Sequence, residues 1–260
     1  MKMIFHTAPN THMELSEYGT NTFYILGQEY VKSEEYRSYT KKAIADGRFT
    51  ILDSGMGDHG EFLQNEQLFE LVKELHPNEV IPTDNLYNSE KTIANTMNMA
   101  KMLAYEGITD TKIFMCPQGK TIDDYLKCWE WATNCPYVAT IGMSKKTVPY
   151  VIAGEASDQS IGVCRNIMYD ILKVRGLITK PVHMLGSEGP QEYIHYEGDE
   201  MIRSTDSCVA IWAAMNDQYF GSPEYVRIST PADYFTREMT SEQQELAIHN
   251  MKVFNAMVAL

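Results

Sequence analysis

Short apolar runs alternate along the chain with longer stretches in which apolar residues recur every three or four positions. A short apolar run bounded by turn residues is typical of a buried strand, whereas the longer spacing is typical of a helix. The expected strands cover residues 3–5, 49–53, 79–82, 112–116, 138–142, 181–185 and 201–205, with an eighth near 225–228. The expected helices cover residues 61–75, 89–105, 122–132, 160–175, 207–215 and 240–260.

This alternation of strands and helices predicts a parallel sheet with right-handed crossovers. Eight strands favour an α/β fold of the (β/α)8 TIM-like barrel type in one domain, residues 1–260, and an open doubly wound sheet is the alternative. In the last helix, Leu246, Met251, Phe254 and Met257 form an apolar stripe. We expect that stripe to pack on the barrel exterior, although a partner-binding helix would show the same pattern.

Composition narrows the class of protein. Of the 260 residues, 44% are hydrophobic and 22% are charged, which is ordinary for a globular chain. The five cysteines form no C-x-x-C pair, so we expect reduced thiols and no metal site. Residues 1–6 lack the long apolar region of a signal peptide, and no apolar run nears the roughly 20 residues of a membrane span. We therefore expect a cytoplasmic protein without a membrane partner, or one of the host cytoplasm if a phage encodes it.

The net charge of −13 argues against a broad surface for binding nucleic acid. Proteins that bind polyanions usually carry a basic footprint, because each neutralised phosphate releases counterions. Any contact with nucleic acid would therefore come from a local patch. The candidates for that patch are Lys145, Lys146 and Arg203, with Arg165, Lys173 and Arg175 as further basic residues.

Two aspartates, Asp53 and Asp206, each follow a short apolar strand and precede a serine. The carboxyl end of a buried strand is where α/β enzymes place reactive groups, because the strand fixes the side chain and the next loop opens to substrate. A pair of carboxylates there predicts one nucleophile and one general acid/base. The alternative is that each Asp-Ser only caps a helix.

Polar residues and glycines follow the other expected strands as well. Asp84 could accept two N–H bonds from a guanidine-like edge, and Gln118 could exchange hydrogen bonds with a carbonyl. Gly119, Gly142 and Gly186 would let backbone N–H groups approach a flat ligand. Taken singly, each is equally consistent with a plain turn. As an ordered series, they predict a site for a planar heterocycle.

This series resembles the tRNA-guanine transglycosylases, and more closely the short phage-type relatives that insert 7-deazaguanines into DNA. The resemblance spans about residues 49 to 216 in the same order. The matching motifs are residues 51–55, 79–84 with Thr92, 117–119, 141–143, 183–186 and 203–207.

The resemblance implies exchange of a base without strand cleavage. Asp206 matches the nucleophile that would hold the sugar as a covalent ester, and Asp53 matches the general acid/base. Asp84, Gln118 and Gly142 match positions that read the purine edge, with Met143 and Met184 as apolar neighbours of the ring. The base itself would be the co-substrate, with no other cofactor, and the target nucleotide would be flipped out of the duplex.

The chain departs from the tRNA enzymes in two places. It lacks their C-x-C-x-x-C and histidine zinc site, and Cys208-Val209-Ala210 follows the matching aspartate where they have Pro-Thr-Arg. The missing zinc segment favours DNA over tRNA as the partner. A homodimer or a partner subunit could supply a basic surface. The alternatives are a tRNA- or nucleoside-level purine transglycosylase, an N-glycoside hydrolase, and a non-catalytic partner subunit.

Some residues carry weaker predictions. Asp58 and His59 could orient a substrate, but a surface loop is the more common use of such a pair. His183 is expected to be a core histidine that could also hydrogen-bond near the site. Tyr125, Trp129 and Trp131 could stack on a base, although their helical spacing favours packing. Cys116 lies beside the expected site without an evident base partner, so it is not assigned as a nucleophile.

Overall fold

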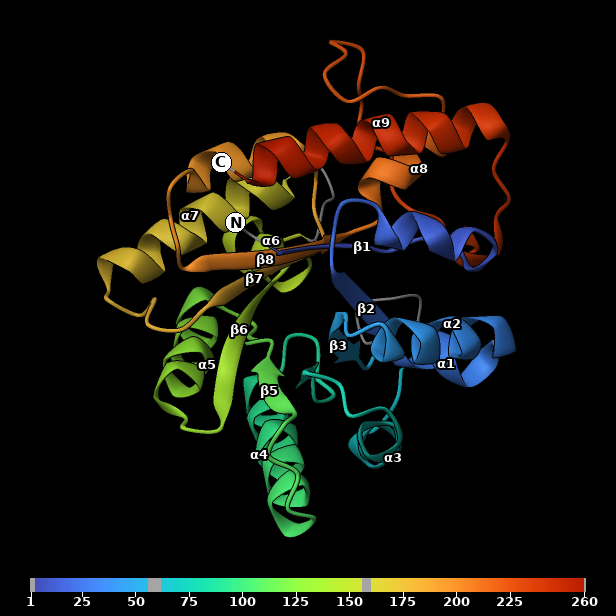
Figure 1. Cartoon of the computed structure of the whole chain (residues 1–260). Helices are drawn as coiled ribbons and strands as arrows, with labels where there is room; N and C mark the ends of the chain where they lie inside the picture. Colours follow the sequence, from blue (N-terminus) through green and yellow to red (C-terminus); the bar gives the residue numbers. More distant parts are fainter. Residues whose placement is uncertain (1–2, 56–61, 156–159, 260) are drawn as a thin grey trace.

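Eight parallel strands form a single sheet in the computed structural model, which describes residues 3–55, 62–155 and 160–259 (Figure 1). The order of strands across the sheet is β1-β8-β7-β6-β5-β4-β3-β2. The strands are β1 (Met3–His6), β2 (Thr22–Leu26), β3 (Phe49–Asp53), β4 (Glu79–Val80), β5 (Lys112–Met115), β6 (Val138–Ser144), β7 (Val182–Leu185) and β8 (Ile202–Ser207).

The sheet curls so that its two outer strands, β1 and β2, meet. The hydroxyl of Thr22 in β2 donates a hydrogen bond to the carbonyl of Ile4 in β1. The rings of Phe5 and Tyr24, from the same two strands, contact edge to face with centroids 6.0 Å apart. The protein is therefore a nearly closed (β/α)8 TIM-like barrel, as the alternation predicts, and not an open doubly wound sheet.

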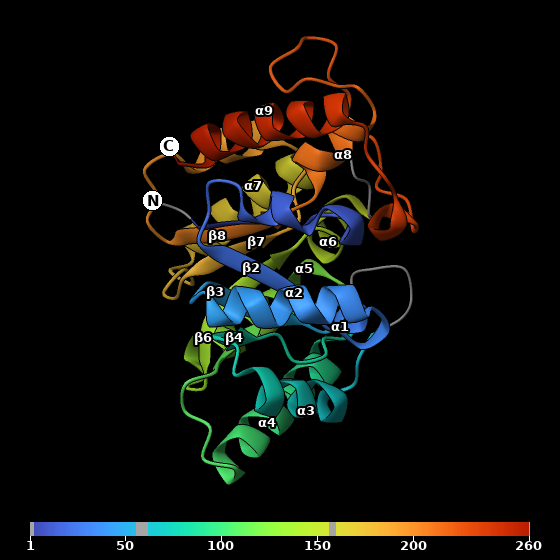
Figure 2. The same ribbon diagram turned by 45° about the vertical axis from the view of Figure 1, so that its right-hand side comes forward.

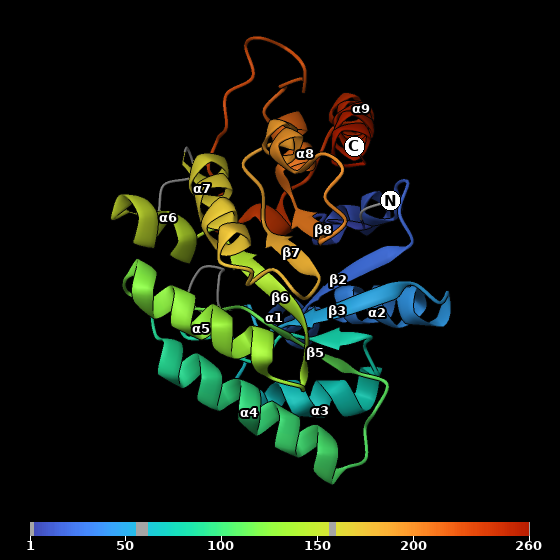
Figure 3. The same cartoon turned by 90° about the vertical axis from the view of Figure 1, so that its left-hand side faces the viewer.

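Helices cover the outside of the barrel (Figures 2 and 3). The α-helices are α1 (Gly27–Lys32), α2 (Glu34–Ala45), α3 (Asn65–Leu75), α4 (Ser89–Tyr105), α5 (Ile122–Asn134), α6 (Thr147–Ala153), α7 (Ile161–Val174), α8 (Val209–Met215) and α9 (Ser241–Val258). The described residues also form the 3-10 segments η1 (Asn10–Glu17), η2 (Pro190–Tyr196) and η3 (Tyr234–Thr236). The spacing predicts six of these helices, α3, α4, α5, α7, α8 and α9, but it does not predict α1, α2 or α6.

The eighth strand is β2, and the expectation of a strand near residues 225–228 is wrong. All five residues of β2 are buried, because helices cover one face and the barrel interior the other. A strand buried on both faces reads as an uninterrupted apolar run, without alternation. Residues 225–228 instead belong to an irregular segment in which Val226 is 60% exposed.

The C-terminal helix α9 packs along the outside of the barrel beside α8 (Figure 1). A capping box begins it, in which Thr240 accepts from the Gln243 backbone and Gln243 accepts from the Thr240 backbone. Leu246, Met251 and Phe254 of the predicted stripe are buried. The stripe therefore belongs to the core of this chain, and the remaining stripe residue, Met257, is half-buried.

Candidate functional site

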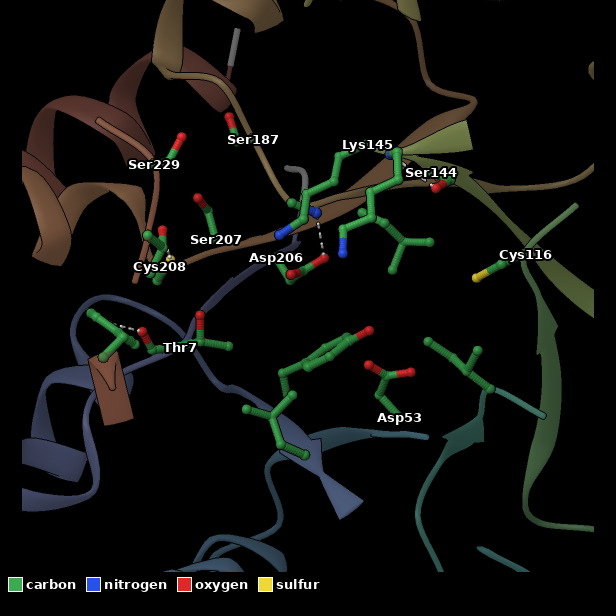
Figure 4. Close-up of a pocket in the computed structure, with 18 of the residues that line it drawn as sticks. Thr7, Asp53, Cys116, Ser144, Lys145, Ser187, Asp206, Ser207, Cys208 and Ser229 are labelled. Carbon is green, nitrogen blue, oxygen red and sulfur yellow. Dashed lines mark hydrogen bonds between the residues drawn. The ribbon is translucent and has the colours of Figure 1, made fainter. Parts of the chain in front are cut away.

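A cavity of about 330 Å³ lies at the carboxyl ends of the strands (Figure 4). This volume is in the range of pockets that bind small molecules, and this end of a TIM barrel is where active sites occur. Side chains from strand ends and from the loops after them line it. They are Thr7, Tyr24, Leu26, Asp53, Ile81, Asp84, Leu86, Cys116, Ser144, Lys145, Lys146, Leu185, Gly186, Ser187, Asp206, Ser207, Cys208, Arg227, Ser229, Thr230, Pro231, Tyr234 and Phe235.

Asp206, near the end of β8, points one carboxylate oxygen at two hydrogen-bond donors. The Nε2 atom of His183 lies 2.9 Å from Oδ1, and the backbone N–H of Gly186 donates to the same oxygen at 2.9 Å. Among the residues that the structure describes, none donates a hydrogen bond to Oδ2. The side chain is 16% exposed and lines the cavity, so Oδ2 is the atom available to a ligand.

The surroundings of Asp206 keep it ionised. Burial alone would raise its pKa, but the hydrogen bonds from His183 and Gly186 and the nearby charge of Lys145 lower the pKa below its ordinary value. Figure 4 shows Lys145 on the same side of the cavity as Asp206. A carboxylate that is both anionic and fixed through one oxygen is suited to act as a nucleophile.

His183 is fully buried in β7 and contacts the candidate nucleophile directly. Its Nδ1 atom lies 2.8 Å from the hydroxyl of Ser204, and its ring packs against Phe5, Tyr24 and Phe114. Burial lowers its pKa, which the Asp206 carboxylate only partly opposes. The two predictions for this residue are therefore both confirmed, because it is a satisfied core histidine and it lies at the site.

Asp53 lies across the cavity from Asp206. It is the last residue of β3, where it pairs in register with Leu26 of β2. Figure 4 shows both carboxylates directed into the space between them, from opposite walls. The structure thus brings together the two aspartates that the sequence singles out.

Asp84 is a third carboxylate on the cavity wall, and its state differs from that of Asp206. Burial raises its pKa to about 7, although a hydrogen bond from the side-chain amide of Gln118 works in the opposite direction. The amide oxygen of Gln118 in turn accepts from the Thr147 hydroxyl and from the backbone N–H of Tyr87. Gln118 is fully buried and does not line the cavity, so it positions Asp84 and does not contact a ligand.

Two methionines that the resemblance places beside a ligand lie elsewhere. Met143 and Met184 are fully buried and are absent from the cavity wall, whereas their neighbours Ser144 and Leu185 line it. Successive side chains of a strand point to opposite faces, so these methionines pack between the barrel and its helices. The motif locates the correct strand ends, but the side chains that face the ligand space are one residue further on.

The three glycines also differ from one another. Gly186 lines the cavity, has a left-handed φ of 64°, and provides the N–H that binds Asp206. A side chain at Gly119 would collide with the backbone of Tyr125, and one at Gly142 would collide with Phe114 and Leu185. Gly119 and Gly142 are therefore required for packing, and the structure does not place either on the cavity wall.

The expected basic patch is only partly assembled. Lys145 and Lys146 line the cavity, and Arg227, which the sequence does not single out, joins them from the segment between α8 and α9.

The other basic residues lie away from the cavity. Arg203 lies in the barrel interior, bound to Glu79, and Arg165 is fully buried against Glu192. Lys173 pairs with Asp199 on the surface. The assignment of Arg203 to this patch is wrong, because its side chain points to the other end of the barrel.

The remaining predicted residues are three aromatic residues of α5, Cys116, Asp58 and His59. Tyr125 and Trp129 are fully buried in α5, and Trp131 packs against the core, so helical packing accounts for all three. Cys116 lines the cavity, but burial, Asp84, Asp53 and Asp206 raise the pKa of its thiol well above the ordinary value, which disfavours a thiolate. All five cysteines are free thiols. Asp58 and His59 lie outside the described residues.

Sequence reasoning also misses several residues of the site. Thr7 directly follows β1 and Tyr24 lies in β2, whereas Ser229, Thr230 and Tyr234 come from the segment before α9. A signal exists for Tyr24, because it lies in an apolar run bounded by polar residues, but the irregular segment carries none.

The fold and the site define an α/β barrel in which three carboxylates, those of Asp53, Asp84 and Asp206, line one cavity. The chain matches no family model, and no curated protein matches it either. Within residues 3–55, 62–155 and 160–259, no group of three or more His, Cys, Asp or Glu side chains is arranged to hold a metal ion. In the same ranges, no helix has both the length and the apolar character required to cross a bilayer.

Proposed function

We propose that this protein is a glycosyltransferase of the guanine transglycosylase type, which replaces guanine in a nucleic acid with a 7-deazaguanine derivative. The observation that carries the proposal is the pair Asp206 and Asp53, whose carboxylates face one cavity from opposite walls (Figure 4). Two carboxylates flanking a bond between sugar and leaving group are the usual arrangement for breaking that bond.

In this mechanism Asp206 attacks the sugar. Its Oδ2 atom forms a bond to the anomeric carbon while the bond from that carbon to guanine breaks, and the electron pair of that bond leaves with the base. The donors at Oδ1 support this role, because they keep the carboxylate anionic and fix its orientation.

Asp53 acts as the general acid/base toward the departing and the incoming base. It gives a proton to the departing guanine and then takes one from the incoming deazapurine, whose nitrogen attacks the anomeric carbon as the ester to Asp206 breaks. One group serves both half-reactions, so the enzyme returns to its starting state.

Asp84 reads the base edge in this proposal. An ionised carboxylate can accept two parallel N–H bonds from the edge of a guanine-like ring. The buried Gln118 and Thr147 hold Asp84 in place. Ile81, Leu86 and Leu185 add apolar surface to the cavity, which suits the faces of a flat ring.

The polymer in the proposal is DNA, for which the departures from the tRNA enzymes are the reason. Lys145, Lys146 and Arg227 supply positive charge at the cavity and can meet a phosphate, although the chain as a whole carries −13. Because the cavity is small, the target nucleotide would enter it flipped out of the duplex.

The test is incorporation of labelled guanine into guanine-containing DNA by wild type and by the Asp206→Ala variant. The proposal predicts incorporation by wild type and none by the variant. Asp123→Asn, on the exposed face of α5, is the matched control and should keep full activity. Undiminished incorporation by Asp206→Ala would remove the assigned nucleophile, and turnover of free nucleosides without a polymer would favour the nucleoside-level alternative.

A further inference from the structure

A continuous chain of hydrogen bonds runs through the barrel interior from its amino end to Asp206. At the far end, Arg203 donates to both carboxylate oxygens of Glu79, at 2.6 and 2.8 Å, and to the Thr140 hydroxyl at 2.9 Å. The Nε atom of Arg203 lies 3.2 Å from the hydroxyl oxygen of Ser204. Ser204 then contacts Nδ1 of His183 at 2.8 Å, and Nε2 of His183 contacts Asp206 at 2.9 Å.

The direction of each bond follows from what each group can donate. Arginine has no acceptor, so the Ser204 oxygen accepts the Nε–H of Arg203. An ionised carboxylate carries no hydrogen, so Nε2 of His183 must donate to Asp206. A neutral imidazole with Nε2–H has an unprotonated Nδ1, which accepts the hydroxyl hydrogen of Ser204. The opposite tautomer would place two acceptors face to face at 2.9 Å.

We infer that Arg203 and Ser204 are positioning residues that fix His183 as the Nε2–H tautomer and thereby hold Asp206 in its reactive orientation. Arg203 is itself fixed by its two bonds to Glu79, so the chain begins at a rigid group. Ser204 and His183 are 1% and 0% exposed, so water cannot readily substitute for either contact. This series of hydrogen bonds explains why an arginine and a glutamate occupy the interior of the barrel far from the cavity.

The tautomer can be measured without any activity. In protein labelled with ¹⁵N-histidine, the ring nitrogen shifts distinguish a protonated from an unprotonated nitrogen. His183→Gln identifies the signal among the seven histidines. Wild type should show Nε2–H. The decisive background is Asp206→Ala, because alanine has no hydrogen-bonding group to face Nε2 and so imposes no tautomer of its own, whereas an asparagine would keep its oxygen toward the Gly186 N–H and Nε2.

In Asp206→Ala, the inference predicts that His183 remains Nε2–H, because Ser204 still donates to Nδ1. In Asp206→Ala/Ser204→Ala the preference should weaken, and in Asp206→Ala/Ser204→Thr, which keeps the hydroxyl, it should be retained. The same tautomer mixture in Asp206→Ala with and without Ser204→Ala would overturn the inference.

The consequence for catalysis rests on the proposed function, so it has its own measurement. Ser204→Ala alone should lower kcat about tenfold and leave KM unchanged, which is the effect of losing one ordinary buried hydrogen bond. Ser204→Thr should restore the rate. An unchanged kcat in Ser204→Ala would show that the chain does not position Asp206, whereas inactivity of wild type on DNA would count against the proposed function and leave the NMR result standing.

Discussion

The two ends of the barrel interior both hold buried charge, but they hold it in opposite ways. At the amino end, Arg203 and Glu79 form a two-point ion pair that Thr140 completes. At the carboxyl end, Asp206, Asp53 and Asp84 surround a cavity. The first arrangement satisfies its charges within the protein, whereas the second leaves room for a ligand to complete it. The comparison indicates that the carboxyl end serves chemistry, whereas the amino end serves stability and, through Ser204 and His183, the orientation of Asp206.

The largest expected effect comes from Asp206. Asp206→Asn keeps the shape of the side chain but removes the nucleophilic charge, so base exchange should fall by about 10³-fold or more. The free energy of unfolding should change little by comparison. Single-turnover rates with guanine-containing DNA measure the first quantity, and urea unfolding measures the second. A variant that retains a tenth of the activity would contradict the assignment.

Asp53, on the opposite wall, should give the next largest effect. Asp53→Asn cannot transfer a proton, so the rate should fall by about 10²- to 10⁴-fold. The covalent intermediate with Asp206 should still form with a substrate whose leaving group needs no proton. Comparing a guanine substrate with an activated one measures this difference, and an equal loss on both substrates would assign Asp53 a structural role.

Substitutions at the amino end of the barrel should lower the free energy of unfolding. Arg203→Met leaves the Glu79 carboxylate buried without its cation, which should lower the free energy of unfolding by about 3–5 kcal/mol. Replacing both residues, in Arg203→Met/Glu79→Met, should recover most of that loss, because no charge is then left unpaired. Urea unfolding of the three proteins tests this. A loss below about 1 kcal/mol in the single variant would show that the pair is not an essential part of the barrel.

The smallest expected effect is a pH dependence at Asp84. Its pKa is raised to about 7, so below pH 7 it is mostly protonated and cannot accept both N–H bonds of the base. The affinity for guanine should therefore rise about tenfold per pH unit between pH 5 and 7 and level off above it. Calorimetric titrations at several pH values test this, with Asp84→Asn expected to be weak and independent of pH.

The sequence predicts the barrel and the ends of its strands well, because those features depend on local patterns. Seven of the eight strands, Asp53 and Asp206 all follow from apolar runs and the polar residues after them. Strand β2 is missed although its residues 23–26 form a short apolar run of the same kind as the predicted strands. Met143 and Met184 are misplaced because the pattern locates a strand end without fixing which side chain faces inward.

Long-range pairing accounts for the other differences. Nothing near Arg203 in the sequence indicates that its partner is Glu79, which lies 124 positions earlier in the chain. Gln118 similarly binds Asp84, and Lys145 and Arg227 approach the cavity from different loops. These contacts depend on how the strands are ordered around the barrel, so only the folded structure shows them.

The most direct test of the central claim is a search for a covalent bond between Asp206 and DNA. Wild-type protein is incubated with a guanine-containing oligonucleotide and no incoming base, denatured, digested and analysed by mass spectrometry. The account predicts a sugar–aspartyl adduct on the peptide that contains Asp206, and none in Asp206→Asn. No adduct in wild-type protein that exchanges labelled guanine, or an adduct on a different residue, would contradict it.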